Sequence, residues 1–184
     1  MSIKKSKLKK TIATVLYRAL TLLKWLSIGI LMGLVVGSIS SAFSFCLTFV
    51  TELRMKHPYI VYGLPIGGLV IVGLYKLLLK DKKKGTNVVI NSISDKPQIS
   101  SLIAPLIFVS TVITHLFGGS AGREGAALQL GGSLGNTFGR VFKFKERDKK
   151  IIIMSGMSAA FSALFGTPMA AAIFSIEAAT VGSL

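Results

Sequence analysis

An arginine and a glutamate stand side by side in a stretch of the sequence that is otherwise free of charge. Arg123 and Glu124 lie within FGGSAGREGAALQLGGSLG, residues 117–135. The glycines before the pair let the chain turn sharply, and helical character resumes at Ala126, so Glu124 is predicted at or near a helix N-terminus. Free backbone N–H groups and the positive end of the helix dipole make such a terminus an anion site. A carboxylate can occupy that site until a proton or another anion displaces it.

Two interpretations of this pair stay open on the residues alone. Ionisable residues at bilayer depth are functional candidates, and because burial favours a protonated carboxyl while positive groups favour the carboxylate, a proton and an anion can compete there. The alternative is a static ion pair between Arg123 and Glu124 that pins two helices. A phosphate loop is not indicated, because no Lys-Ser/Thr follows the glycines, and no soluble strand precedes them as a dinucleotide fold requires.

The rest of the chain is typical of a membrane protein. Hydrophobic residues make up 51% of the 184 residues and charged residues 16%. Residues 25–51, 58–75, 98–122 and 151–176 contain no Asp, Glu, Lys or Arg. Because about 20 apolar residues cross a bilayer core, three of these runs are long enough to span and the second is borderline. The sequence therefore predicts an all-α integral membrane protein.

Basic residues cluster beside the apolar runs. Lys and Arg number 22 against 7 Asp and Glu, giving a net charge of +15. The positive-inside rule makes the clusters cytoplasmic loops, which predicts a multi-pass protein of the cell membrane with a cytoplasmic N-terminus. It also places both Lys96 and the loop at residues 140–150 in the cytoplasm, so residues 98–139 are predicted to be re-entrant. Nucleic-acid binding is not expected, since no aromatic residues are interleaved with a basic face outside the membrane runs.

The chain divides into two predicted parts. Residues 1–24 are expected to form a basic amphipathic helix at the cytoplasmic interface, and residues 25–184 the membrane domain. In the first span Gly29, Gly33 and Gly37 lie near one helix face, which predicts close approach of a neighbouring helix.

Two further breaks follow from local composition. Residues 88–93 could form a helix of about two turns, too short to span and therefore re-entrant or interfacial. Gly166 to Pro168 is predicted to divide the last run into two helices.

His115 is interpreted as a packed, hydrogen-bonded side chain, with a proton relay as the alternative.

No metal-ligand spacing, nucleophile–His–acid set or carboxylate pair is present, so neither an enzyme, a metal site nor a cofactor is expected.

Longer motifs carry a family resemblance. GREG followed by Q-x-G-G, with FGTPMAAAIFSIE further along, resembles the CLC chloride channels and anion/proton antiporters. THLFGGSAGREG, together with GTN at 85–87, is most similar to the fluoride/proton antiporter branch. The resemblance covers about residues 25–180 and implies a CLC-like fold of two inverted repeats with broken and re-entrant helices, anion sites at helix ends, and a homodimer of independent pores.

The resemblance also assigns roles to single residues. Glu124 matches the gating glutamate that alternates between the anion site and protonation, and Gly122, Arg123 and Gly125 match its motif. The segment of the inner anion site reads Gly-Ser-Gly-Ile-Pro in chloride members and begins Gly-Met-Asn in many fluoride members. Here Thr86 and Asn87 stand in it, which leaves the preferred anion open.

Glu177 matches a structural glutamate at the end of the IFSIE helix. In chloride antiporters the next residue is the glutamate of internal proton transfer, whereas this chain has Ala178. That difference argues against the chloride-antiporter proton route and is compatible with a fluoride exchanger or a channel.

The expected function is fluoride export coupled to protons through Glu124. The alternatives are a chloride channel, a chloride/proton antiporter, or a non-transporting half-protein that packs with other membrane helices. Because the sequence stops soon after Glu177, it resembles most of the first repeat only. The expected partners are an inorganic anion, protons, the lipid membrane and a second CLC-like repeat.

Overall fold

Every regular element in the described part of the chain is a helix. The computed structural model describes residues 2–79 and 100–181, with side chains for 12–79 and 100–178. In chain order the elements are α1 (Ser2–Lys56), the 3-10 helix η1 (Pro58–Gly63), α2 (Leu64–Leu79), α4 (Ile103–Leu116), α5 (Arg123–Val141), α6 (Glu146–Phe165) and α7 (Pro168–Val181). The all-α prediction is confirmed. Thr86, Asn87 and the short helix predicted at 88–93 lie outside the described residues.

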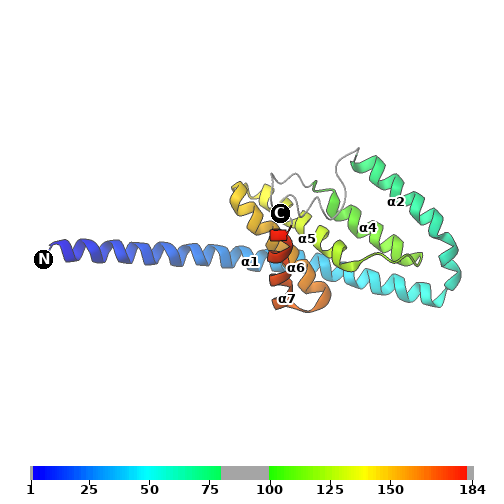
Figure 1. The fold of residues 1–184 in the computed structure, drawn as a ribbon, viewed down its shortest axis with the longest axis horizontal. Helices are drawn as coiled ribbons and strands as arrows, with labels where there is room; N and C mark the ends of the chain where they lie inside the picture. Colours follow the sequence, from blue (N-terminus) through cyan, green and yellow to red (C-terminus); the bar gives the residue numbers. More distant parts are fainter. Residues whose placement is uncertain (1, 80–99, 182–184) are drawn as a thin grey trace.

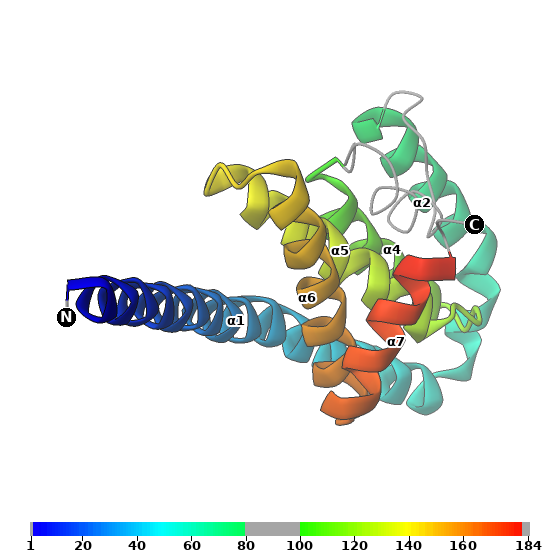
Figure 2. The same cartoon turned by 60° about the vertical axis from the view of Figure 1, so that its left-hand side comes forward.

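The first helix is a single rod whose N-terminal part projects from the body formed by the other helices (Figures 1 and 2). No helix break separates Lys24 from Trp25, since the first glycine of the chain is Gly29 and no proline precedes Pro58. The predicted boundary between a basic helix and the membrane domain is therefore not a structural boundary. The interfacial position of residues 1–24 stays a prediction.

Two helical stretches are long and apolar enough to cross a membrane. They are Ile12–Lys56 and Pro58–Leu79, and the second, borderline by sequence, reaches 22 residues because η1 joins α2. Only 11% and 6% of their most apolar windows are buried within the chain. Their large apolar side chains are exposed instead, among them Leu26, Ile30, Leu34, Ile66, Leu69 and Leu77. Such surfaces fit a lipid environment.

The third apolar run does not form a simple span. The glycines after it end α4 at Leu116, so the helix has 14 residues and a length of about 21 Å, well short of the hydrocarbon core. The expectation that this run could span alone is wrong for that reason.

The chain instead turns back, and α5 returns along α4. Ser133 Oγ donates to the carbonyl oxygen of Ser100 at 3.2 Å, and Thr137 Oγ1 donates to Ser101 Oγ at 3.0 Å. The start of α4 and the second half of α5 therefore meet, as a re-entrant hairpin over residues 98–139 requires.

Basic groups gather near the same end of the body. Arg140 Nη1 donates to Ser101 Oγ at 3.4 Å, and the ammonium of Lys24 lies 5.7 Å from the centre of the Phe144 ring. Lys24 of α1 and the loop after α5 thus lie at one level, as they would if both faced the cytoplasmic surface.

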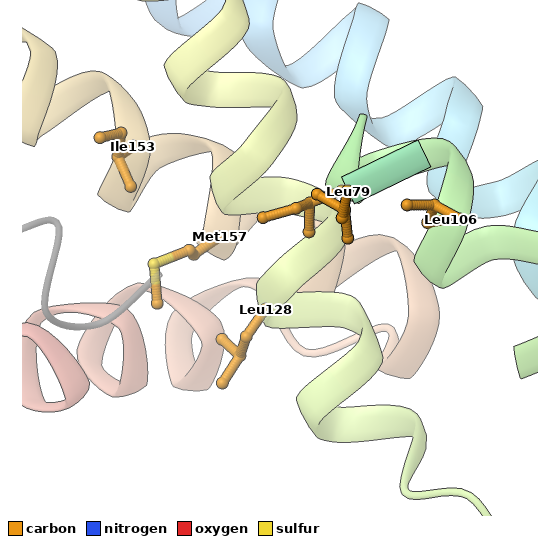
Figure 3. Packing of buried hydrophobic residues seen from close by; sticks show 6 residues of the cluster. Leu79, Leu106, Leu128, Ile153 and Met157 are labelled. Atoms are coloured by element: carbon orange, nitrogen blue, oxygen red, sulfur yellow. The ribbon is translucent and has the colours of Figure 1, made fainter. Parts of the chain in front are cut away.

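Helix α5 is the centre of the body, because helices pack on several of its sides. The closest approach is to α6, where an added Cβ at Gly131 or at Gly156 would overlap the other residue's carbonyl oxygen. A further cluster joins α2, α4, α5 and α6 (Figure 3), made of Leu79, Ile103, Leu106, Leu128, Ile153 and Met157. This packing fixes α5, and with it the position of its first turn.

The three glycines of the first span are not packed by this chain. A Cβ at Gly29, Gly33 or Gly37 would meet no atom within 4 Å. The buried face of α1 includes Met32 and Val36, each of which comes one residue before a glycine. Because successive residues are rotated by about 100° around a helix, Gly33 and Gly37 lie to one side of that buried face. The predicted close helix contact is therefore absent from the described part of this chain, and packing against another chain stays a prediction.

The break in the last run is confirmed. Gly166 ends α6 with a left-handed φ of 68°. Its N–H donates to the carbonyl oxygen of Ser162 at 2.8 Å, and Pro168 opens α7. A residue with a side chain is strained at that φ, and proline suits a first helical position.

Candidate functional site

The first turn of α5 presents backbone donors without acceptors. Its N-cap is Gly122, with φ −65° and ψ 118° and no side chain that could accept a hydrogen bond. The first helical bond runs from the Ala126 N–H to the Gly122 carbonyl at 3.3 Å. Among the described residues, the N–H groups of Arg123, Glu124 and Gly125 have no acceptor. The prediction that Glu124 lies in the first turn of a helix is confirmed, and such a terminus attracts anions.

The two charged side chains are exposed rather than buried. Both Arg123 and Glu124 lie in the open, because the cover given by neighbouring helices begins at Ala126. The expectation that Glu124 sits in apolar surroundings is therefore not met within this chain.

The ion-pair alternative loses support. Arg123 and Glu124 belong to the same turn of one helix, so a bond between them could not pin two helices together. The described part of the chain contains no ion pair between these two residues.

The turn that leads into α5 is held by an aromatic ring. Phe117 packs over Gly63 and Gly67, where an added Cβ would overlap the ring. Gly118 follows with a φ of +82°, and the Gly119 N–H donates to the Thr114 carbonyl at 2.8 Å. The chain can reverse here because glycine adopts this φ without strain.

A cavity of about 250 Å³ lies between this turn and the C-terminal ends of α1 and α4. Its lining residues are Thr51, Arg54, His115, Gly118, Gly119, Ser120, Ala121 and Arg123. Two arginines and a histidine, Arg54, Arg123 and His115, are thus among the residues beside the start of α5. Ser120 also lines the cavity.

Arg54 is the residue that sequence reasoning missed. It follows the uncharged run of α1 closely, yet more than sixty residues of sequence separate it from the glycine-rich turn. Only the antiparallel arrangement of α1, α2 and α4 brings it there. The sequence signal that could have pointed to Arg54 is its position: it is an arginine at the C-terminal end of an apolar helix, away from the basic cluster at the N-terminal end.

His115 is hydrogen-bonded, as its interpretation predicted. Its Nδ1 lies 2.9 Å from the carbonyl oxygen of Thr111. Because a carbonyl oxygen can only accept, Nδ1 carries the proton and Nε2 is left for other partners.

The remaining candidate residues lie apart from this cavity or outside the described chain. Glu177 is in α7 with an exposed side chain, and Ala178 packs against the cluster around Leu79 and Met157. Thr86 and Asn87 are not described. Within the described ranges, no three His, Cys, Asp or Glu side chains are placed to hold a metal ion.

Comparison with known proteins places these features in a family. The model of the voltage gated chloride channel family matches residues 67–183, more than half of the chain. A chloride/fluoride channel protein of Pseudomonas syringae pv. tomato is 38% identical over 88% of this chain and 36% of its own length. An uncharacterized protein of Methanocaldococcus jannaschii is 25% identical over 85% of this chain and 38% of its own length.

The fold agrees with a solved structure. The crystal structure of a CLC-type fluoride/proton antiporter superposes with a TM-score of 0.74 and 31% identity, over 85% of this chain and 44% of the other. The chain therefore spans less than half the length of these three proteins. It belongs to the CLC family of voltage gated chloride channels and related transporters, a family of membrane transport proteins and not of enzymes.

Proposed function

We propose that the chain is part of an anion transporter that exports fluoride in exchange for protons, with Glu124 as the gate. One observation carries the proposal. Glu124 lies in the first turn of a helix that begins after a glycine turn, beside N–H groups that have no acceptor in the described chain. The relatives support the choice of ions, since one is named a chloride/fluoride channel protein and the structural neighbour is a fluoride/proton antiporter.

The helix terminus suggests how the gate works. The N–H groups of Arg123, Glu124 and Gly125 can donate hydrogen bonds to one anion at a time. The positive end of the α5 dipole favours binding of that anion. The ionised Glu124 side chain competes for that place. When it binds a proton its negative charge is lost, and an inorganic anion takes the site. Proton uptake and anion entry are thereby coupled.

Gly122 has a defined part in this proposal. Because it has no side chain to cap the helix, the donors stay free for the anion.

Three further residues have proposed roles. Thr86 and Asn87 are proposed to line the inner anion site, and Glu177 is proposed to hold α7 in place.

The partners and the membrane placement are also proposals. The chain spans 36% and 38% of two relatives, and a second CLC-like repeat is proposed to complete the pore. Two complete copies are proposed to form a homodimer of independent pores. A multi-pass position in the cell membrane with a cytoplasmic N-terminus is supported by the hairpin of α4 and α5 and by the nearness of Lys24 to Phe144.

A second candidate is a protein that packs with other membrane helices without transport. The observation in its favour is a groove of about 460 Å³ between α1, α6 and α7, in which Gly29 and Gly33 are open. Small residues let a further helix approach closely.

Flux measurements on the complete gene product in liposomes test these candidates. Fluoride efflux is followed with a fluoride electrode and proton uptake with a pH electrode, and chloride efflux is measured in parallel. We expect fluoride efflux with proton uptake and much slower chloride efflux. Equal chloride efflux without proton movement would favour a chloride channel, and no flux of either anion would favour the packing protein.

A further inference from the structure

We propose that the groove between α1, α6 and α7 binds an acyl chain of an anionic phospholipid from the cytoplasmic leaflet. The phosphate of this lipid is held by Arg147 and Lys150 at the cytoplasmic end of the groove. The inference goes beyond the proposed function. It rests on the proposed membrane placement of the chain and not on transport, so it can fail while fluoride export stands.

The groove is long and narrow. Its volume is about 460 Å³, and on α6 its lining runs from Ile151 to Ser162, about 16 Å at 1.5 Å per residue. These values correspond to a mean cross-section of about 30 Å². A helix with side chains is about 10–12 Å across, so a further helix needs a cross-section of about 80 Å² or more. A hydrocarbon chain fits this width, and the length is close to the depth of one leaflet of the bilayer core.

The lining suits a hydrocarbon chain. No Asp, Glu, Lys or Arg is among the described residues that line the groove. Two of its serines direct their hydroxyls to their own helices. Ser155 Oγ donates to the carbonyl oxygen of Ile151 at 2.9 Å, and Ser175 Oγ donates to that of Ala171 at 2.8 Å. These two hydroxyls therefore need no polar partner in the groove.

Basic residues lie at one end of the groove. Arg147 comes four residues before Ile151 of the lining, and Lys150 comes four residues before Met154. Residues four apart are neighbours on one helix face, so both basic residues continue the lining by one turn. Arginine and lysine bind phosphate, and basic residues on the cytoplasmic side of membrane helices attract anionic headgroups.

Two carboxylates accompany these residues in the first turns of α6. Glu146 is paired with Lys149, whose Nζ lies 2.6 Å from Glu146 Oε1, so that pair adds no net charge. Asp148 is partly buried and offsets one of the two basic residues. The charge at this end of the groove is therefore still positive.

Trp25 marks the same level on α1. It comes four residues before Gly29 of the groove wall, and it shares a cluster with Phe144, which precedes α6. Tryptophan is enriched where the hydrocarbon core meets the headgroups. The groove thus begins at the interface and runs into the core, as a lipid with its phosphate at Arg147 requires.

Native mass spectrometry of the complete gene product tests the site, because it counts the lipids that stay bound. The protein is titrated in detergent with dioleoyl phosphatidylglycerol or with dioleoyl phosphatidylcholine, which has the same chains and no net charge. We expect the first phosphatidylglycerol to bind about fivefold more tightly or better, owing to the two basic residues near its phosphate. Equal affinities for the two lipids would overturn the proposal.

Gly33→Leu and Gly37→Leu form a matched pair for the groove. A Cβ at either glycine of α1 would meet no atom within 4 Å, but of the two only Gly33 lines the groove. Leucine at Gly33 is expected to weaken binding of the first phosphatidylglycerol by about fivefold or more, because it takes the place of the acyl chain, whereas leucine at Gly37 leaves binding unchanged. If Gly33→Leu fails to fold, Ala172→Leu on the α7 wall takes its place.

Arg147→Gln and Lys145→Gln form a matched pair for the headgroup. Lys145 has the same charge and lies at the same end of α6, but a shift of two residues places it on a different face of the helix. Arg147→Gln is expected to remove at least half of the preference for phosphatidylglycerol over phosphatidylcholine, and Lys145→Gln is expected to keep it.

An equal loss in both members of either pair would overturn the site. Unchanged lipid binding in Gly33→Leu would also overturn it, and is the result expected if a helix of the complete protein fills the groove. Fluoride flux does not enter these comparisons. Failure of the lipid site and failure of fluoride export are therefore distinguishable.

Discussion

Gly131 of α5 and Gly156 of α6 pack backbone against backbone, so closely that a Cβ on either would overlap the carbonyl oxygen of the other. This contact sets the distance between the two helices at the centre of the body. A Gly131→Ala substitution must push the helices apart and is expected to cost about 2–3 kcal/mol of the free energy of unfolding. Thermal unfolding in detergent measures the loss.

Gly33→Ala is the control for that substitution. Gly33 is also a helical glycine, but a Cβ there meets no atom within 4 Å. Alanine is expected to leave stability equal or to raise it by about 0.5–1 kcal/mol, since it restricts the unfolded chain. An equal loss in both variants would contradict the packing described for α5 and α6.

Replacement of Gly118 should damage the turn before α5. Alanine at a φ of +82° costs about 1–2 kcal/mol in backbone strain, and its Cβ would lie 3.1 Å from Val61 Cγ2. We expect Gly118→Ala to lower the unfolding temperature, whereas Gly68→Ala, at an open helical position, does not. Equal unfolding temperatures for Gly118→Ala and the parent protein would show that the turn does not need the left-handed conformation.

A side chain at Gly122 should stabilise the helix and impair the anion site. Its φ of −65° and ψ of 118° suit an N-cap residue, so Gly122→Asn and Gly122→Asp are each expected to gain a few tenths of a kcal/mol, in the range of about 0.2–0.5. The aspartate also brings a negative charge to the donors that the anion uses. Fluoride flux should fall about tenfold or more in Gly122→Asp and less in Gly122→Asn. Unchanged flux in Gly122→Asp would argue against an anion at this helix terminus.

Thr137 tests the hairpin of α4 and α5. Its Oγ1 lies 3.0 Å from Ser101 Oγ and 2.8 Å from the Ser133 carbonyl oxygen. Thr137→Val keeps the shape and removes the hydroxyl, with an expected loss of about 0.5–1.5 kcal/mol in unfolding free energy. The control is Thr48→Val on α1, whose exposed hydroxyl donates to the carbonyl oxygen of Ser44 in the same helix. Equal effects of the two substitutions would contradict a stabilising contact between the ends of the hairpin.

Breaks in the helices could be predicted from the sequence where a residue type forces them. Pro168 cannot continue α6, and Gly166 takes a left-handed φ, so the division of the last run follows from two residues. The glycines before Arg123 likewise predict the end of α4 and the start of α5. These are local effects of backbone freedom, which composition reveals directly.

Contacts between distant segments could not be predicted in the same way. The glycines of α1 and those of α5 look alike in sequence. A Cβ would nevertheless meet α6 at Gly131, Gly135 and Gly139 of α5, whereas it would meet no atom within 4 Å at the glycines of α1, because the rotation of each helix about its axis decides which face is covered. Arg54 reaches the cavity through the path of α1, α2 and α4. Exposure of Glu124 within this chain also depends on where its neighbours end.

The most direct test of the gate is the ratio of protons taken up to fluoride released in liposomes that contain the complete gene product with Glu124→Gln. Glutamine has nearly the same shape and cannot bind or release a proton at physiological pH. We expect fluoride movement in this variant to lose its coupling to protons, while a Lys56→Gln control keeps it. A Glu124→Gln protein that exports fluoride with the same proton ratio as the parent protein would contradict the gate.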